Sequence, residues 1–190
     1  MTGKIRIIGG RWRGRRLAVP ADREGVRPTG DRTRETLFNW LQFRIVGADC
    51  LDLFAGTGAL GLEAASRGAS KVVLVERDGE LVAGLRRAVE DWPGSGVLEI
   101  VQADALEWLR RPGERFDMVF VDPPFGQGLC PPALAGLVAG DRLNPGARVY
   151  VEQGVDEEEI DPGESFAVLR RKRQGRVILT LLEYAESPAL

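Results

Sequence analysis

The chain has 190 residues, 44% of them hydrophobic and 28% charged, which is the composition of one ordinary globular domain. It contains no histidine, so histidine-dependent nucleophilic triads and histidine metal sites are excluded. Cys50 and Cys130 lie far apart with no partner at ligand spacing, which predicts two core thiols in a reducing compartment and neither a disulfide nor a zinc site. No apolar run reaches the length of a signal peptide or a membrane span. We therefore expect a cytoplasmic monomer that binds neither metal nor membrane.

Positive charge is concentrated near the N-terminal end. Residues 1–44 contain eleven Lys or Arg and four Asp or Glu, although the net charge of the whole chain is −2. A basic segment on an acidic body is typical of a protein that contacts a polyanion through one face. A solvated surface that merely reflects an arginine-rich composition is the alternative.

The first elements are predicted from turn and cap signals. Residues 4–19 predict a β-hairpin, because β-prone runs flank the pair Gly9-Gly10. Residues 20–30 are rich in proline, glycine and charge and predict a linker. A helix is predicted to begin at Asp31, a favourable N-cap, because apolar residues then recur at helical spacing at Leu37, Phe38, Leu41 and Ile45.

Two arginines, Arg32 and Arg34, fall in the first turn of that predicted helix. Cations at this end oppose the helix dipole. Their position therefore indicates a partner at the start of the helix.

From residue 49 onward, apolar runs alternate with helical patterns. Strands are predicted at 50–54, 72–75, 97–101, 118–121 and 148–151, and helices near 59–68, 79–91, 104–111 and 131–140. This alternation predicts a parallel sheet covered on both faces. Residues 166–183 instead form two β-rich runs joined at Gln174-Gly175, too close for a parallel crossover, and predict an antiparallel hairpin.

A glycine-rich loop follows the first strand of the predicted sheet. Gly56, Gly58 and Gly61 match the dinucleotide fingerprint, and Glu76 ends the next strand, where a carboxylate can accept hydrogen bonds from ribose hydroxyls. The glycines alone do not identify the ligand. Asp52, just before the loop, would repel a pyrophosphate but could hold a cationic aminoacyl sulfonium group.

The third strand adds a further acid. Asp104 follows it, where a carboxylate can meet an adenine amino group. These features favour S-adenosylmethionine over NAD as the ligand. Glu76 and Asp104 each have the alternative of a helix cap or a surface acid. The predicted cofactor contacts around this loop are Asp52, Ala55, Gly56, Thr57, Gly58, Glu76, Asp104 and Ala105.

The fourth strand ends in the motif Asp122-Pro123-Pro124-Phe125, which we predict to be the catalytic segment. Ligands of open α/β sheets bind beyond the carboxyl ends of the strands, so Asp122 should face the cofactor crevice. Its carboxylate and the Pro123 carbonyl can both accept hydrogen bonds from one exocyclic amino group, and Phe125 can stack on the attached ring. A simple strand-ending turn is the alternative.

The basic N-terminal hairpin predicts contacts with RNA. Guanidinium groups pair with phosphates and stack on exposed bases, which makes Arg11, Arg13, Arg15 and Arg16 candidate RNA-binding residues. Trp12 lies among them and can offer a stacking platform for an unpaired base. Trp12 can equally be the core residue of the hairpin.

Two groups of motifs resemble a known family. The 52–58 loop together with Asp-Pro-Pro-Phe resembles class I S-adenosylmethionine-dependent amino-methyltransferases. The N-terminal motifs narrow the resemblance to bacterial 16S rRNA guanine-N2 methyltransferases of the RsmD type; these motifs are Ile7-Ile8-Gly9-Gly10, Arg13-Gly14-Arg15, Arg27-Pro28-Thr29-Gly30-Asp31-Arg32 and Glu35-Thr36-Leu37-Phe38-Asn39. The resemblance covers residues 4–152 and is weaker over the C-terminal hairpin.

The resemblance implies an α/β, Rossmann-like, seven-stranded methyltransferase sheet, mostly parallel with an antiparallel C-terminal strand, and a small N-terminal β-hairpin extension. Residues 27–190 would form the methyltransferase domain, and residues 1–26 a basic hairpin and linker that contacts RNA. The resemblance also implies methylation of guanine 966 of 16S rRNA in the small ribosomal subunit or its assembly intermediate. In such enzymes the 27–39 segment folds over the cofactor, which makes Thr29 and Arg32 candidate cofactor contacts.

Several alternatives remain open from the residues alone. The same pair of acceptors suits an adenine-N6 methyltransferase acting on DNA or RNA. The glycine fingerprint taken alone also fits an NAD-dependent oxidoreductase, and the basic arm also fits a non-catalytic RNA-binding assembly protein. The arginine-rich turn at 170–176 either contacts RNA or is a solvated hairpin tip.

Overall fold

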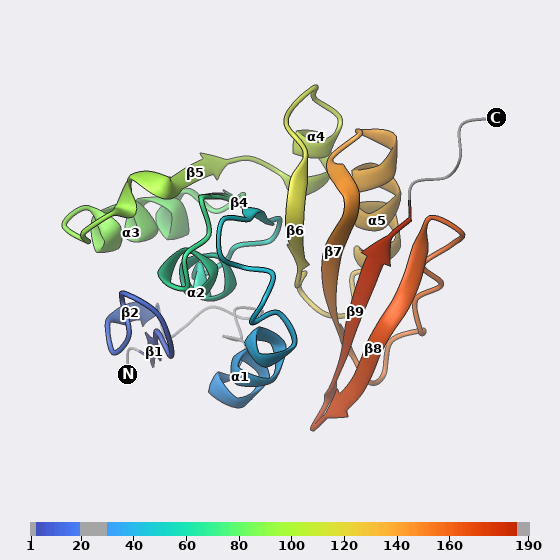
Figure 1. Ribbon diagram of the computed structural model, residues 1–190, viewed down its shortest axis with the longest axis horizontal. Helices are drawn as coiled ribbons and strands as arrows, with labels where there is room; N and C mark the ends of the chain where they lie inside the picture. The colour runs from blue at the N-terminus through green and yellow to red at the C-terminus, as the bar shows by residue number, and fades with distance from the viewer. Residues whose placement is uncertain (1–2, 20–29, 186–190) are drawn as a thin grey trace.

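A computed structural model describes residues 3–19 and 30–185 of the chain. Its main body is a seven-stranded sheet in the order β5-β4-β3-β6-β7-β9-β8 (Figure 1). The strands are β3 (Asp49–Asp52), β4 (Lys71–Glu76), β5 (Leu98–Gln102), β6 (Phe116–Val121), β7 (Leu143–Gly154), β8 (Phe166–Gln174) and β9 (Val177–Tyr184). Strands β3 to β7 pair in parallel, and β9 runs antiparallel to both of its neighbours, β7 and β8. The predicted mixed sheet is confirmed.

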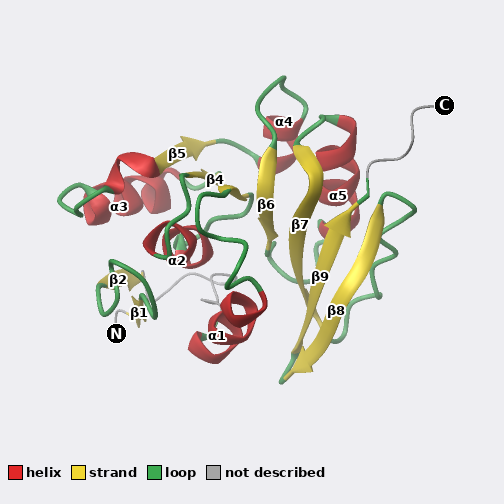
Figure 2. Ribbon diagram, viewed as in Figure 1, coloured by secondary structure: helices red, strands yellow, loops and turns green. Residues whose placement is uncertain are grey.

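Helices cover both faces of this sheet (Figure 2). Alternate residues of the central strands point to opposite faces, so β4 and β6 are buried along almost their whole length and contribute to two separate cores. The core on one face includes side chains of α1, α2 and α3, and the core on the other face includes α4 and α5. The helices are α1 (Asp31–Trp40), α2 (Ala59–Ser66), α3 (Gly79–Val89), α4 (Ala105–Leu109) and α5 (Cys130–Ala139), with a short 3₁₀ turn at Ser95–Val97.

The two cysteines lie in these cores as predicted. Cys50 packs in the first core and Cys130 in the second, and both are free thiols. Burial, the largest cause, raises the pKa of the Cys130 thiol to about 12. Burial is also the largest cause that raises the pKa of Cys50, so neither thiol is poised to react.

The predicted N-terminal hairpin is present, and Gly9-Gly10 lies in the connection between its strands. Strands β1 (Gly3–Arg6) and β2 (Arg16–Val19) pair antiparallel, and residues 7–15 connect them. Gly10 has φ +73°, and its carbonyl accepts a hydrogen bond from the Arg13 N–H at 3.2 Å. It also lies against α2, where a Cβ atom would come within 1.9 Å of the Ser66 carbonyl oxygen. The glycine therefore permits close docking of the hairpin on α2.

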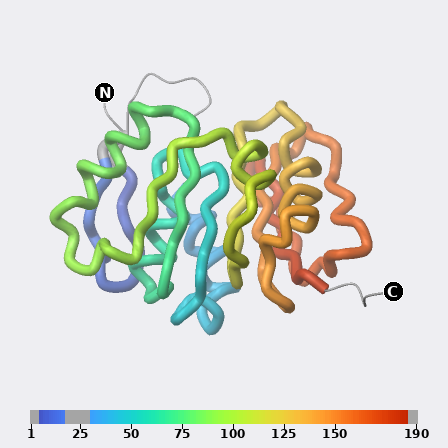
Figure 3. Tube along the Cα trace, turned by 90° about the horizontal axis from the view of Figure 1, so that it is seen from above, coloured from blue at the N-terminus to red at the C-terminus, as the bar shows by residue number. Residues whose placement is uncertain are grey.

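The hairpin and the C-terminal strands lie at opposite ends of the long axis of the molecule (Figure 3). Ile5, Ile7 and Leu17 of the hairpin are buried in the same core as α2 and α3, at the β5 end of the sheet. The hairpin thus packs through apolar side chains against the domain that contains the seven-stranded sheet.

The N-cap of helix α1 is one residue earlier in the chain than predicted. Gly30 is the N-cap and makes no side-chain capping bond, whereas Asp31 is the first helical residue and accepts a hydrogen bond from Arg34. The apolar pattern predicted for this helix is buried, although its last two members lie beyond the helix end; these are Leu37, Phe38, Leu41 and Ile45. Residues 20–29 of the predicted linker 20–30 lie outside the described residues, and its last residue, Gly30, is the N-cap of α1.

The C-terminal hairpin turns at Gln174-Gly175, as predicted, and contacts α1. The Gln174 amide donates to Thr33 Oγ1 at 3.1 Å, and Thr36 Oγ1 donates to Gln174 Oε1 at 3.2 Å. This pair of bonds holds the hairpin tip beside α1, at the carboxyl ends of the parallel strands (Figure 1).

Among the described residues, no helix is long and apolar enough to cross a membrane.

Candidate functional site

A cavity of about 1040 Å³ opens at the carboxyl ends of the parallel strands. This is where open α/β sheets bind ligands. Four carboxylates line it from the ends of four neighbouring strands, namely Asp52, Glu76, Asp122 and Glu152. The cavity is at the upper end of the size range of small-molecule sites, so it can hold a nucleoside-sized ligand and a second ring.

Asp52, the last residue of β3, is 1% exposed, and its Oδ2 accepts a hydrogen bond from the Gly61 backbone N–H at 2.8 Å. A Cβ atom on Gly61 would lie 3.1 Å from Asp52 Oδ2, so glycine lets α2 approach the carboxylate. Burial, followed by the charges of Asp122 and Glu76, raises the pKa of Asp52 to about 7, and the Gly61 N–H acts in the opposite direction.

The loop after β3 contributes Ala55, Gly56 and Thr57 to the cavity lining. Gly58 is not among the lining residues. It is the N-cap of α2 with φ +76°, and a Cβ atom there would lie 2.6 Å from Leu85 Cδ2. Gly58 therefore makes the tight strand-to-helix turn possible, while the three residues before it face the ligand space.

Glu76 ends β4 and fixes this loop. Its Oε2 accepts from the Gly56 N–H at 2.7 Å, and its Oε1 accepts from the Asp78 N–H at 2.8 Å. Each carboxylate oxygen can accept more than one hydrogen bond, so Glu76 keeps capacity toward the cavity that it lines.

Asp104 is both a helix cap and part of the cavity. Its Oδ1 accepts from the Leu106 N–H at 3.0 Å and from the Glu107 N–H at 3.1 Å, which starts α4. Asp104 and Ala105 also line the cavity. The two roles that the sequence left open are compatible in this geometry.

The predicted contacts near α1 are not all at the cavity. Arg32, one of the two predicted contacts, is exposed on α1 and is not among the lining residues, whereas its neighbours Gly30 and Thr33, which were not predicted, line the cavity. Thr29 lies outside the described residues.

The segment after β6 lines the same cavity with all four of its predicted residues, Asp122, Pro123, Pro124 and Phe125. The ring of Phe125 is 39% exposed. Glu157 anchors the following loop, because its Oε1 accepts from the Gly126 N–H at 2.8 Å and its Oε2 accepts from the Gly154 N–H at 2.6 Å. The loop is thereby tied to the end of β7.

Glu152 on β7 was not predicted from the sequence. It is 5% exposed, lines the cavity and accepts a 2.8 Å hydrogen bond from the Tyr150 hydroxyl on Oε2. Burial and then the charge of Asp122 raise its pKa to about 8, against the effect of the Tyr150 hydrogen bond. The sequence feature that could have identified Glu152 is an acid near the end of the strand that follows the Asp-Pro-Pro-Phe motif.

Acidic side chains dominate the cavity. The lining also contains Asp78 and Asp104, against two basic residues, Arg77 and Arg176. The raised pKa values of Asp52 and Glu152 show that these carboxylates are crowded and desolvated. A cationic ligand would relieve this repulsion. In residues 3–19 and 30–185, no three Cys, Asp or Glu side chains are grouped so that they could hold a metal ion.

The N-terminal arm divides into exposed arginines and a buried tryptophan. Arg11, Arg13, Arg15 and Arg16 are exposed, as RNA contacts would require. Trp12 is 1% exposed, and its Nε1 donates to the Pro93 carbonyl at 2.9 Å. The prediction that Trp12 contacts RNA is therefore wrong, because its ring lies inside the fold.

A second tryptophan covers this one. Trp92 packs edge-on against Trp12 with ring centroids 5.1 Å apart. Arg11 and Arg15 then lie over the two rings, with guanidinium carbons 4.8 Å and 5.1 Å from the centroids of Trp12 and Trp92. The aromatic pair supports the arginine surface from beneath.

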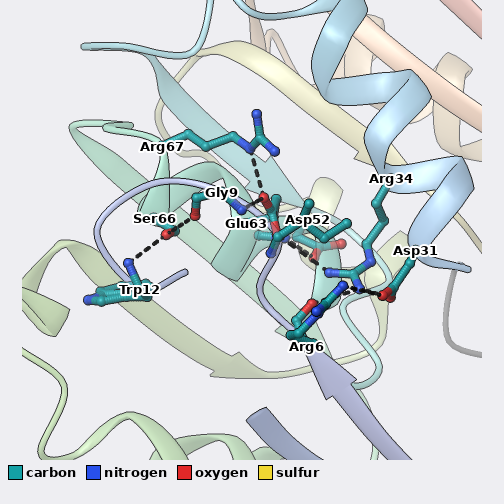
Figure 4. A network of polar contacts seen from close by, with 11 residues as sticks. Arg6, Gly9, Trp12, Asp31, Arg34, Asp52, Glu63, Ser66 and Arg67 are labelled. Atoms are coloured by element: carbon teal, nitrogen blue, oxygen red, sulfur yellow. Dashed lines mark hydrogen bonds and ion pairs between the residues drawn. The ribbon is translucent and has the colours of Figure 1, made fainter. Parts of the chain in front are cut away.

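A buried carboxylate on α2, Glu63, joins the hairpin to the rest of the fold (Figure 4). Glu63 is fully buried and accepts from the Ile8 N–H and the Gly9 N–H, each at 2.8 Å. Arg67 donates to it at 2.7 Å and Arg34 at 3.5 Å. This accounts for Arg34, whose position in the first turn of α1 indicated a partner.

Arg34 extends this network to the start of α1. Its fully buried guanidinium donates to the Arg6 carbonyl at 2.8 Å and to Asp31 Oδ1 at 2.5 Å (Figure 4). Ser66 adds a link by donating to the Gly9 carbonyl at 2.6 Å. The hairpin, α1 and α2 therefore share one polar network beside the cavity.

The basic C-terminal turn is partly neutralised. Arg171 pairs with Glu159, and Arg176, at the cavity, pairs with Asp156 at 2.9 Å. Lys172 is exposed on the edge strand β8. Both interpretations of this turn, an RNA contact and a solvated tip, fit the arrangement.

A model of the family described as Conserved hypothetical protein 95 matches residues 5–183 of the chain. The chain belongs to this family. Two relatives similar to it are named Ribosomal RNA small subunit methyltransferase D. The one from Haemophilus influenzae is 42% identical over 95% of this chain and 94% of the relative. The one from Escherichia coli is 43% identical over 96% of this chain and 91% of the relative.

The fold of the Conserved hypothetical protein 95 family is also known from solved structures. The structure of yhhF from Escherichia coli has a TM-score of 0.89 and 42% sequence identity to this chain, and covers 97% of this chain and 100% of that one. The resemblance to RsmD-type methyltransferases that the motifs indicated is confirmed by these relatives.

Proposed function

We propose that this protein transfers a methyl group from S-adenosylmethionine to the exocyclic N2 amine of a guanine in 16S rRNA, guanine 966 by resemblance, in the cytoplasmic small ribosomal subunit or its assembly intermediate. One observation carries the proposal. The segment from Asp122 to Phe125 lines the same cavity as the glycine loop and the strand-end acids. The names of relatives that share more than 40% of their residues with this chain support methylation of small-subunit ribosomal RNA, and the guanine and its position come from the motif resemblance.

S-adenosylmethionine supplies an electrophilic methyl group on a sulfonium ion and, in its aminoacyl part, an ammonium group. The acidic cavity fits these positive charges, because Asp52 lines it together with the loop residues Ala55, Gly56 and Thr57. Glu76 can accept from ribose hydroxyls and Asp104 from an adenine amine. The residues present therefore fit the proposed donor.

Asp122 and Pro123 are the proposed acceptors for the target amine. A proline has no N–H group, so the Pro123 and Pro124 backbone presents carbonyl oxygens without competing donors. The lone pair of a ring amine is delocalised, which makes it a poor nucleophile. Acceptors that draw on its N–H bonds as positive charge develops stabilise the transition state more than the ground state. Phe125, partly exposed in the cavity wall, can stack on the attached ring.

The arginine surface of the hairpin is the proposed contact with the rRNA backbone. Residues 1–26, as a basic hairpin and linker, would bind RNA, and residues 27–190 would carry the chemistry. Exposed guanidinium groups at Arg11 and Arg15 are held over buried tryptophans, so they are oriented outward before RNA arrives.

The test is methyl transfer to unmodified small subunits, free rRNA and DNA, with the labelled base identified after digestion. We expect N2-methylguanine in the small-subunit rRNA. Asp122→Ala should reduce the rate at least about 100-fold, the scale of losing one transition-state acceptor, while cofactor affinity changes little. Asp141→Asn, at an exposed acid paired with Arg115 outside the cavity lining, is the control and should retain full activity.

Three outcomes would contradict the proposal. Label on adenine N6 would favour the other ring-amine activity. Tight binding of NAD without binding of S-adenosylmethionine would favour an oxidoreductase. Full activity of Asp122→Ala would remove the proposed role of the catalytic segment.

A further inference from the structure

Glu152 lies beside Asp122 on the neighbouring strand. Val121 of β6 pairs with Val151 of β7, so Asp122 and Glu152 each follow one residue beyond that pair. Neighbouring strands are about 4.8 Å apart. Both side chains line the cavity, and the charge of Asp122 raises the pKa of Glu152. Two carboxylates therefore stand next to each other where the target base would enter.

The Glu152 carboxylate is held in one orientation. Tyr150, two residues earlier on the same face of β7, donates its hydroxyl hydrogen to Glu152 Oε2 at 2.8 Å. Within the described ranges, Oε1 has no hydrogen-bond partner, yet it is not enclosed as a buried unsatisfied atom. One oxygen is thus occupied by the protein, and the other remains available to a ligand in the cavity.

The chemistry of guanine matches two adjacent acceptors. Its Watson–Crick edge presents the N1–H and the N2 amine side by side, both as hydrogen-bond donors. Adenine presents an amine beside N1, which has a lone pair and no hydrogen. A carboxylate next to the amine acceptor therefore attracts the guanine edge and repels the adenine edge.

We propose that Glu152 is a specificity-determining residue that accepts the N1–H of the target guanine through Oε1, while Asp122 accepts from the N2 amine. This inference rests on the proposed function, since it assigns a further contact to the same base. Sites built to hydrogen-bond a substrate N–H reject analogues without it, because the buried acceptor is then left unpaired.

The electrostatics of the site agree with this role. The titratable groups that face Glu152 are Asp122 at the end of β6 and Tyr150 on β7. Burial and the charge of Asp122 hold its pKa at about 8, so the carboxylate is under-stabilised before substrate binds. A donor from the base satisfies the ionised form and lowers this pKa.

The experiment compares two substrates that share the 2-amine. Small subunits are reconstituted with either guanine or 2-aminopurine at the target position; 2-aminopurine keeps the amine but has a lone pair at N1. Wild-type protein should prefer guanine by at least about 10-fold in kcat/KM. Glu152→Ala should slow the guanine reaction by about that factor, leave the 2-aminopurine rate within about 3-fold, and so abolish the preference.

Glu152→Gln is the second variant, because it keeps the shape and one acceptor oxygen. It should recover part of the preference for guanine. Titration with S-adenosylmethionine and far-ultraviolet circular dichroism verify that each variant is folded and binds the donor.

The outcomes separate the two levels of inference. If wild-type protein leaves guanine N2 unmethylated, the proposed function fails and the Glu152 contact fails with it. If wild-type protein methylates guanine but Glu152→Ala slows both substrates equally, Glu152 is structural and the specificity role alone is overturned. An unchanged preference in Glu152→Ala overturns it as well.

Discussion

The buried carboxylate Glu63 offers a test of how the hairpin is held. Four donors converge on the Glu63 carboxylate, and Glu63→Gln replaces one of its two oxygens by an NH₂ group. The donors that converge on Glu63 are the backbone N–H groups of Ile8 and Gly9 and the guanidinium groups of Arg34 and Arg67. The amide can serve some of them but must direct its own N–H toward others. Arg34, itself fully buried, then loses its buried counter-charge and keeps only the half-exposed Asp31.

The expected loss of stability in Glu63→Gln follows from the burial of the Arg34–Glu63 ion pair. Removing one partner of a buried ion pair costs about 3–5 kcal/mol, because the other charge stays desolvated. A domain of this size loses about 2–4 °C of Tm per kcal/mol. We therefore expect Glu63→Gln to lower Tm by about 10 °C. Glu107→Gln is the control, because its pair with Arg110 is exposed on both sides and should contribute less than about 1 kcal/mol.

Thermal and urea unfolding, followed by circular dichroism at pH 7, measure both variants. Tryptophan fluorescence adds a local probe, because Trp12 and Trp92 lie at the hairpin and should change environment when it loosens. A Glu63→Gln protein within about 1 kcal/mol of the wild type would refute the reasoning, since the network would then carry no net stability.

The remaining predictions concern charge. Because the pKa of Asp52 rises from 3.8 to about 7 on folding, the folded apo protein binds this proton more tightly, and its stability should fall as pH rises between these values. Asp52→Asn should reduce this pH-dependent loss in the free energy of unfolding, measured with urea, by up to about 4 kcal/mol. A change in stability that is the same at every pH would contradict the prediction. Replacing Arg11, Arg13 and Arg15 together by alanine should weaken RNA binding and lower the slope of log affinity against log salt by up to about 3, with donor affinity unchanged. An unaltered slope would argue against an RNA-binding arm.

Much of the fold could be predicted from local pattern. Strand and helix alternation gives a parallel sheet, and the rule that ligands bind at the carboxyl ends of strands brings Asp52, Glu76 and Asp122 to one cavity without any knowledge of contacts. The antiparallel hairpin at Gln174 follows from the absence of room for a crossover.

Other features depend on partners distant in sequence. Whether Trp12 is a platform or a core residue is decided by Trp92, which covers it, and no local pattern pairs the two. Arg34 looked like a cation awaiting a ligand, but it pairs with Asp31 in the same turn and with the buried Glu63 on another helix, and only the second partner is distant in sequence. Glu152 carries no motif, and its proposed role depends on the register that sets it beside Asp122.

The bonds between Gln174 and α1 have a consequence for biosynthesis. They join residues 138 and 141 positions apart, so the first helix meets these partners only after β8 has left the ribosome. The hairpin before it finds Glu63 much sooner, since its contacts span 54 and 55 positions. Vectorial synthesis should therefore dock the arginine-bearing hairpin early and complete the α1 wall of the cavity late.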